Sequence, residues 1–179
     1  MKIRYLGTAA TEGFPAAFCN CKACTAARRD ISKELRTRSQ MLIDTELMID
    51  FPPESYYHAM RFGVDLSAVR TLLVTHSHTD HFYAQEFVNR GYKFAEGIAS
   101  EFLDIYGNGE VLSVYEEGTR REMRDGVRSG IRMHCLHPFD QFTAGGYEIF
   151  VLPAHETPKE DALLYGIRRG GKSLLYLND

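Results

Sequence analysis

The sequence lacks several features that would place it in a special class of protein. It has no apolar run as long as a membrane-spanning helix, no internal repeat and no low-complexity tract. Its net charge is only −3, which argues against broad, unspecific binding to nucleic acid. With 44% hydrophobic and 25% charged residues among 179, the composition predicts one globular domain, residues 1–179, with its own core.

Cysteine is scarce, and no secretory signal precedes the first predicted strand near Met1. Three of the four cysteines, Cys19, Cys21 and Cys24, stand together in one loop. Thiols at this spacing outside an oxidising compartment favour a metal site over disulfide bonds, and three of them can surround one tetrahedral zinc ion. We therefore expect a cytoplasmic protein with a structural zinc at this loop. Three unrelated thiols in a loop are the alternative.

Metal-binding side chains are concentrated directly after an apolar stretch, Val69–Val74, that predicts a buried strand. Residues two apart in an extended chain point to the same side, so His76 and His78 can offer imidazole nitrogens to one ion. Asp80 follows at a predicted helix start, where the N-terminal amides favour a carboxylate, and His81 points elsewhere, toward a second ion. Three nitrogens, one oxygen and no thiolate suit zinc, with manganese or iron as alternatives. A polar turn with solvent-exposed histidines is the competing interpretation.

This H-x-H-x-D-H pattern resembles the signature of the metallo-β-lactamase superfamily of metal-dependent hydrolases. The resemblance implies two divalent ions that share a hydroxide, with Asp80 and His81 also carrying catalysis. It implies further ligands after later strands, and His155 and Asp179 stand where they are expected. The metal ligands implied in this way are His76, His78, Asp80, His81, His155 and Asp179. The family pattern has one more His, which would lie beyond Asp179.

Two N-terminal features narrow the resemblance. The G-T-x-x-x-x-G-F-P opening at residues 7–15 and the cysteine loop are similar to the branch of cyclic phosphodiesterases used in phosphonate breakdown. In that branch the cysteines hold a structural zinc together with a C-terminal His, for which this sequence shows no counterpart. The resemblance implies a hydrolase of a small-molecule phosphodiester. Hydrolysis of lactones, thioesters or RNA ends on the same scaffold is the alternative, as is a metal-binding protein without turnover.

The predicted elements agree with the four-layer αβ/βα sandwich, an α/β fold, that the resemblance implies. The chain would supply its first half and the opening strands of a second half that is truncated. The predicted strands are 2–6, 39–44, 47–50, 69–74, 101–106, 131–136, 147–152, 162–167 and 173–177, and the predicted helices are 24–32, 52–62, 82–89 and 109–127. His58, on the second helix, is interpreted as a surface or packing residue. No membrane or nucleic-acid partner is expected, and a homo-oligomer is left open.

Overall fold

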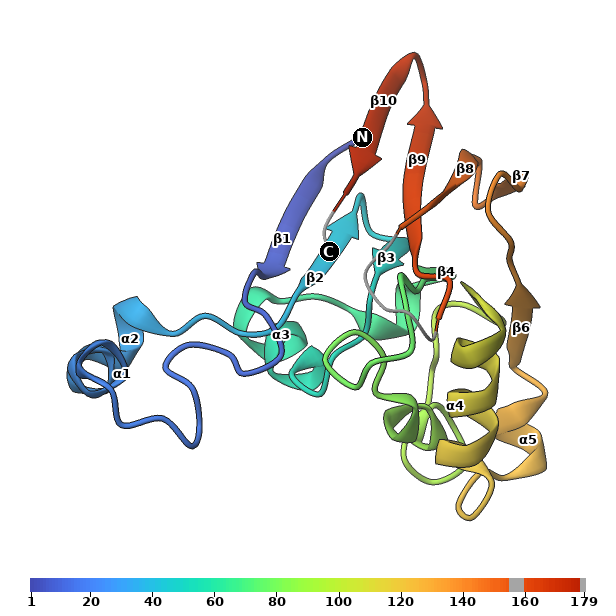
Figure 1. Ribbon diagram of the computed structural model, residues 1–179. Helices are drawn as coiled ribbons and strands as arrows, with labels where there is room; N and C mark the ends of the chain where they lie inside the picture. Colours follow the sequence, from blue (N-terminus) through green and yellow to red (C-terminus); the bar gives the residue numbers. More distant parts are fainter. Residues whose placement is uncertain (155–159, 178–179) are drawn as a thin grey trace.

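The computed structural model describes residues 1–154 and 160–177, so two predicted metal ligands, His155 and Asp179, lie outside the described residues. The described chain forms two β-sheets and a layer of helices (Figure 1). The first sheet has six strands in sequence order, β1 (Ile3–Gly7), β2 (Gln40–Ile43), β3 (Leu47–Ile49), β4 (Thr71–Leu73), β5 (Leu103–Gly107) and β6 (Ile131–Cys135). The second sheet has the order β10 (Lys172–Tyr176), β9 (Leu163–Arg169), β8 (Tyr147–Pro153) and β7 (Gln141–Ala144).

The pairing of the first sheet changes from antiparallel to parallel along its length. Strands β1, β2 and β3 pair antiparallel, whereas β3, β4, β5 and β6 pair parallel. Parallel neighbours need crossover connections. The crossovers carry α3 (Ser55–Phe62), η2 (Leu66–Ala68), η3 (Ala84–Asn89), α4 (Gly109–Thr119) and α5 (Asp125–Arg128). As a result, the residues that follow β3, β4 and β5 meet at one edge of the sheet.

The central strands of the first sheet are buried on both faces. On one face, Met48 and Leu72 pack in a cluster with apolar side chains from the helices. On the other face, Ile49 and Leu73 pack against the second sheet. A strand covered on both sides is apolar at nearly every position, which explains why these short strands were recognisable in the sequence.

Several predicted elements differ from the structure. The helix predicted over residues 109–127 ends at Thr119, whose buried hydroxyl donates to the carbonyl of Tyr115 at 2.8 Å, and α5 follows as a separate turn. Of the helix predicted over residues 82–89, only Ala84–Asn89 are helical, and they form the 3-10 helix η3. The prediction that Asp80 begins a helix is therefore wrong, because Asp80 lies in the turn before it. Strand β7 was not predicted.

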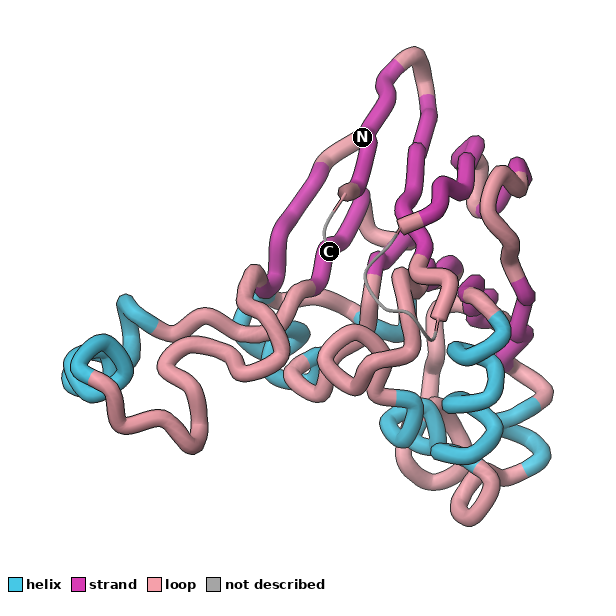
Figure 2. Tube along the Cα trace, viewed as in Figure 1, coloured by secondary structure: helices cyan, strands magenta, loops and turns pink. Residues whose placement is uncertain are grey.

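Residues 8–38 form an arm that extends away from both sheets and consists mostly of loop (Figure 2). It carries α1 (Lys22–Ala27), η1 (Arg28–Asp30) and α2 (Ile31–Glu34), where one helix over residues 24–32 was predicted. Backbone hydrogen bonds join its two ends, from Thr8 N–H to the carbonyl of Thr37 at 2.9 Å. The cysteine loop thus belongs to a segment that leaves the sheet and returns to it.

The second sheet has one buried and one open face. Ile149, Val151 and Tyr165 are buried between the two sheets. Phe150 of β8 and Leu175 of β10 point to the opposite face of this sheet. Phe150 is half-buried there, and Leu175 is 54% exposed. All elements of residues 131–154 and 160–177 are strands, so the second helical layer of the predicted sandwich is not among the described residues. No helix in the described part of the chain is long and apolar enough to cross a membrane.

Candidate metal centre

Asp50 and Thr75 build the floor of the candidate site, because they follow the parallel neighbours β3 and β4. The Asp50 side chain is fully buried and accepts hydrogen bonds from the Thr75 N–H at 2.8 Å and the Thr75 hydroxyl at 3.0 Å. Its backbone has a φ of 61°, a left-handed conformation that aspartate tolerates better than most residues. A buried carboxylate therefore lies directly beneath the histidine motif.

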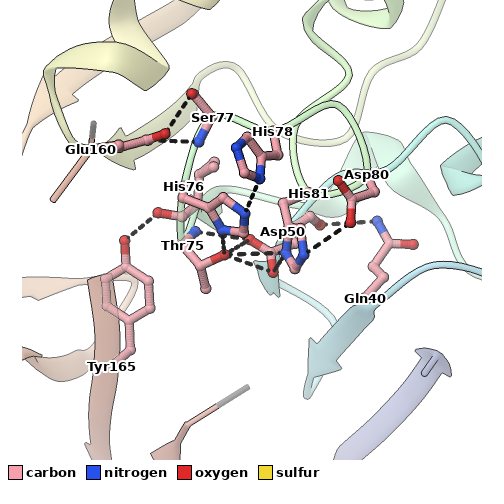
Figure 3. Close-up of polar contacts among 11 residues, drawn as sticks. Gln40, Asp50, Thr75, His76, Ser77, His78, Asp80, His81, Glu160 and Tyr165 are labelled. Atoms are coloured by element: carbon pink, nitrogen blue, oxygen red, sulfur yellow. Dashed lines mark hydrogen bonds and ion pairs between the residues drawn. The ribbon is translucent and has the colours of Figure 1, made fainter. Parts of the chain in front are cut away.

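Three histidines gather above this carboxylate (Figure 3). The ring centroid of His76 is 4.6 Å from that of His78 and 4.2 Å from that of His81. His76 Nε2 lies 3.1 Å from His78 Nδ1. Two nitrogens bound to one tetrahedral zinc at about 2.0–2.1 Å are about 3.3 Å apart, so this pair is close to the spacing of two ligands of a single ion.

A second pair of donors lies beside the first. Asp80 Oδ2 is 3.4 Å from His81 Nε2. The other nitrogen of His81, Nδ1, is 2.8 Å from Asp50 Oδ2 and 3.2 Å from the Thr75 hydroxyl. A carboxylate at Nδ1 fixes the orientation of the ring, so Nε2 faces Asp80. The two pairs follow the division into two ions that was expected from the sequence, and the assignment of these residues as ligands stays a prediction.

The two carboxylates also control the charge of the site. Burial lowers the pKa of His81, but the hydrogen bonds and charges of Asp50 and Asp80 outweigh it and raise that pKa to about 10. Burial raises the pKa of Asp80, but its hydrogen bond and ion pair with His81 outweigh it and lower that pKa to about 2. Each carboxylate thus favours positive charge between them. The donor set, three imidazoles and a carboxylate, fits a divalent ion such as zinc.

The three cysteines of the arm form a separate cluster. The sulfur atoms of Cys19, Cys21 and Cys24 all lie within 4.8 Å of one another. The Cys24 N–H donates to Cys21 Sγ at 3.5 Å, at the start of α1, and this bond together with the neighbouring Cys19 thiol lowers the pKa of Cys21 to about 7. A thiol that ionises near neutral pH is suited to bind metal. The three thiols could serve as three of the ligands of one metal ion.

Comparison with known proteins identifies the architecture. No protein-family model and no curated protein matches the sequence. Solved structures do match. A diphosphatase of the PhnP family has a TM-score of 0.68 and 21% identity over 94% of this chain, and the Bacillus subtilis metallo-β-lactamase fold protein YhfI has a TM-score of 0.64 and 17% identity over 97%. The short form of human tRNase Z has a TM-score of 0.70 and 14% identity over 100%.

This chain has the metallo-β-lactamase fold. It spans 61% of the length of the first two structures and 69% of the third. The two sheets and one helical layer described above are therefore a large part of a metallo-β-lactamase fold, as the sequence motif predicted.

Sequence reasoning missed three residues that support the site within this fold. Asp50 and Thr75 contact His81, and Glu160 accepts hydrogen bonds from the N–H and the hydroxyl of Ser77, both at 2.7 Å. Asp50 had a readable signal, because it ends an apolar strand just before Pro52-Pro53, as the histidine motif ends the next strand. Glu160 had none, since its partner is 83 positions away.

Proposed function

We propose that this protein is a metal-dependent hydrolase with two metal ions, acting on phosphodiesters. The observation that carries the proposal is the pair of donor groups, His76 with His78 and Asp80 with His81, held over the buried carboxylate of Asp50. Two divalent ions in such a site would supply Lewis acidity and a nucleophile derived from water. The fold of the PhnP-family diphosphatase and of tRNase Z supports this class of site.

In this proposal Asp50 and Asp80 have different roles. Asp50 is buried and engaged by Thr75 and His81, so it orients His81 and favours a cation without touching substrate. The pKa of Asp80 is about 2, so its carboxylate is ionised at neutral pH. It can therefore accept a hydrogen bond from a water molecule and orient that water toward phosphorus. His155 and Asp179 remain proposed as further ligands, from the resemblance of the sequence.

We also propose a structural zinc at the cysteine cluster. Three thiols within 4.8 Å of one another can occupy three positions of a tetrahedral ion. The arm contributes few buried side chains, only Cys24 and Ala27 in α1, so a bound ion would supply the stability that its core does not.

The proposal is tested by metal analysis and by an assay on bis(p-nitrophenyl) phosphate, with a lactone, a thioester and an RNA substrate in parallel. Both are carried out on this chain. We expect zinc, manganese or iron to be bound, and Asp80→Ala and His81→Ala each to lower phosphodiesterase activity at least about a hundredfold. His134→Ala is the matched control, because His134 pairs with Asp104 on β5 instead of with the site. Failure of the purified protein to bind any metal after reloading would disprove the proposal.

A further inference from the structure

Glu160 links the chain at the start of β9 to the centre of the histidine motif. Its carboxylate accepts hydrogen bonds from the Ser77 N–H, the Ser77 hydroxyl and the Asn108 amide, each at 2.7 Å. Three donors for one carboxylate is a well-satisfied arrangement, and it leaves Glu160 little freedom to move. Figure 3 shows this carboxylate beside Ser77, on the side of the loop opposite Asp80 and His81.

The anchor of this carboxylate is itself rigid. Asn108 is buried and caps α4, because its side-chain oxygen accepts the Val111 N–H at 3.0 Å. The Asn108 amide also donates to the carbonyl of Asp161 at 2.9 Å. Glu160 is thus fixed to the junction of β5 and α4, not only to the loop.

The start of β9 holds the end of β4 at two further points. Leu163 N–H donates to the carbonyl of Thr75 at 2.8 Å, and the buried Tyr165 hydroxyl donates to the carbonyl of Val74 at 2.6 Å. Together with Glu160 and Ser77, these bonds fasten the strand end just before the histidines and the residue between them. The second sheet therefore holds the histidine loop in place.

Ser77 is the point where such a hold affects both flanking histidines. Ser77 lies between the two histidines in a bend of the loop, and Glu160 binds both its backbone N–H and its hydroxyl. A carboxylate that holds Ser77 in this way restricts the backbone on which His76 and His78 are mounted, without competing for the metal. We infer that Glu160 is a positioning residue for His76 and His78. This inference rests on the proposed function, which supplies the metal.

The inference is tested with Zn²⁺ and Co²⁺ on the purified protein and on Glu160→Ala, Glu160→Gln and Glu148→Ala. Glu148 is an exposed glutamate of β8, the strand that pairs with β9, so its replacement removes the same charge without touching the histidine loop. Metal affinity is measured by competition with a chromophoric chelator, the visible spectrum of bound Co²⁺ reports ligand geometry, and hydrogen exchange reports the Ser77 amide. We expect E160A to weaken metal binding at His76 and His78 about tenfold, to alter the Co²⁺ spectrum and to speed exchange at Ser77.

The three variants separate positioning from a general loss of charge. E160Q keeps the shape and one acceptor oxygen, so it should recover part of the affinity, and E148A should match the unmodified protein. Faster exchange at Ser77 with unchanged affinity and spectrum in E160A would overturn the inference. If the unmodified protein bound no metal, the proposed function would fail, and Ser77 exchange alone would then decide whether Glu160 holds the loop.

Discussion

At the scale of single residues, the buried carboxylate of Asp50 determines how its neighbours are arranged. It binds the Thr75 N–H and hydroxyl and the His81 ring nitrogen in one place. None of these contacts is visible from spacing, because Asp50 and His81 are 31 positions apart. The residue type at the end of β3 was readable from the sequence, but its partner was not.

Replacing Asp50 by Asn should weaken metal binding about tenfold or more while leaving the fold intact. The amide has nearly the same shape, but it lacks the charge that orients His81 and favours a cation. The measurement is metal affinity by chelator competition, with thermal denaturation to establish folding. Asp104→Asn is the control, since Asp104 forms its ion pair with Arg132 at the edge of the sheet. Equal metal affinity in D50N and the unmodified protein would show that Asp50 does not contribute to the metal site.

His58 is a packing residue, the second of the two interpretations that the sequence allowed. It is fully buried, with its two ring nitrogens 2.6 Å from Gln40 Oε1 and 2.7 Å from the Thr37 hydroxyl. Burial lowers its pKa to about 4. Its replacement by Ala should therefore reduce stability, because Gln40 and Thr37 would lose their buried partner.

The low pKa of His58 predicts a loss of stability in acid. The unfolded chain takes up this proton near pH 6.5, whereas the folded chain does so only near pH 4, so the stabilising effect is complete above pH 6.5 and is lost as the pH falls to 4. The loss should reach about 2 kcal/mol by pH 5. Urea denaturation at pH 7 and pH 5 measures it, with His58→Asn as the comparison. If the free energy of unfolding fell by the same amount between pH 7 and pH 5 in H58N, protonation of His58 would not be the cause of the loss.

At the scale of elements, the strands of the first sheet were predicted well and the helices less well. Strands buried on both faces, such as β3 and β4, give continuous apolar runs that are easily read. Strand β7 is short and mostly polar, so it lacked that signal. The charged stretch after Thr119 has good helix formers, but the chain turns there instead. The hydrophobic pattern of the sequence predicts which segments are buried, whereas the residues at which helices end depend on local contacts.

The arm gives an element-scale prediction about the cysteine cluster. Zinc bound by Cys19, Cys21 and Cys24 should join the loop before α1 to the helix itself, and so protect the arm from proteolysis. Trypsin should cleave at Arg28 or Arg29 faster after treatment with a chelator, and in Cys21→Ser, as followed by mass spectrometry. Cys135→Ser is the control, since Cys135 is an exposed cysteine of β6. A rate of cleavage that changes neither with a chelator nor in Cys21→Ser would argue against a structural ion.

At the scale of the whole molecule, the chain spans about two thirds of the length of the structures whose fold it shares. It covers 61–69% of the compared structures, and the outer face of its second sheet carries exposed apolar side chains. The fold could be predicted because the H-x-H-x-D-H motif is specific and sits after a buried strand. The site could be predicted only as far as its local residues, since the contacts that orient them come from β3 and β9.

Two ions should bind this chain with different affinities. The predicted ligands of the first ion are His76, His78, His155 and the bridging Asp179, whereas the second ion has Asp80 and His81 with a share of Asp179. Fewer ligands give lower affinity. Isothermal titration with Zn²⁺ should therefore show a tight and a weak step. Two equally tight steps would contradict this difference in ligand number.

The bonds between β9 and the histidine loop also set an order of events during synthesis. Ser77 and Glu160 are 83 positions apart, and Val74 and Tyr165 are 91 apart. A nascent chain therefore exposes its histidines long before their supports have been translated, and closing such distant contacts is slow. We expect the loop to reach its final geometry only after β9 has emerged from the ribosome. A metal ion that arrives earlier would meet an unformed site, so metal loading should be one of the last steps in the maturation of this protein.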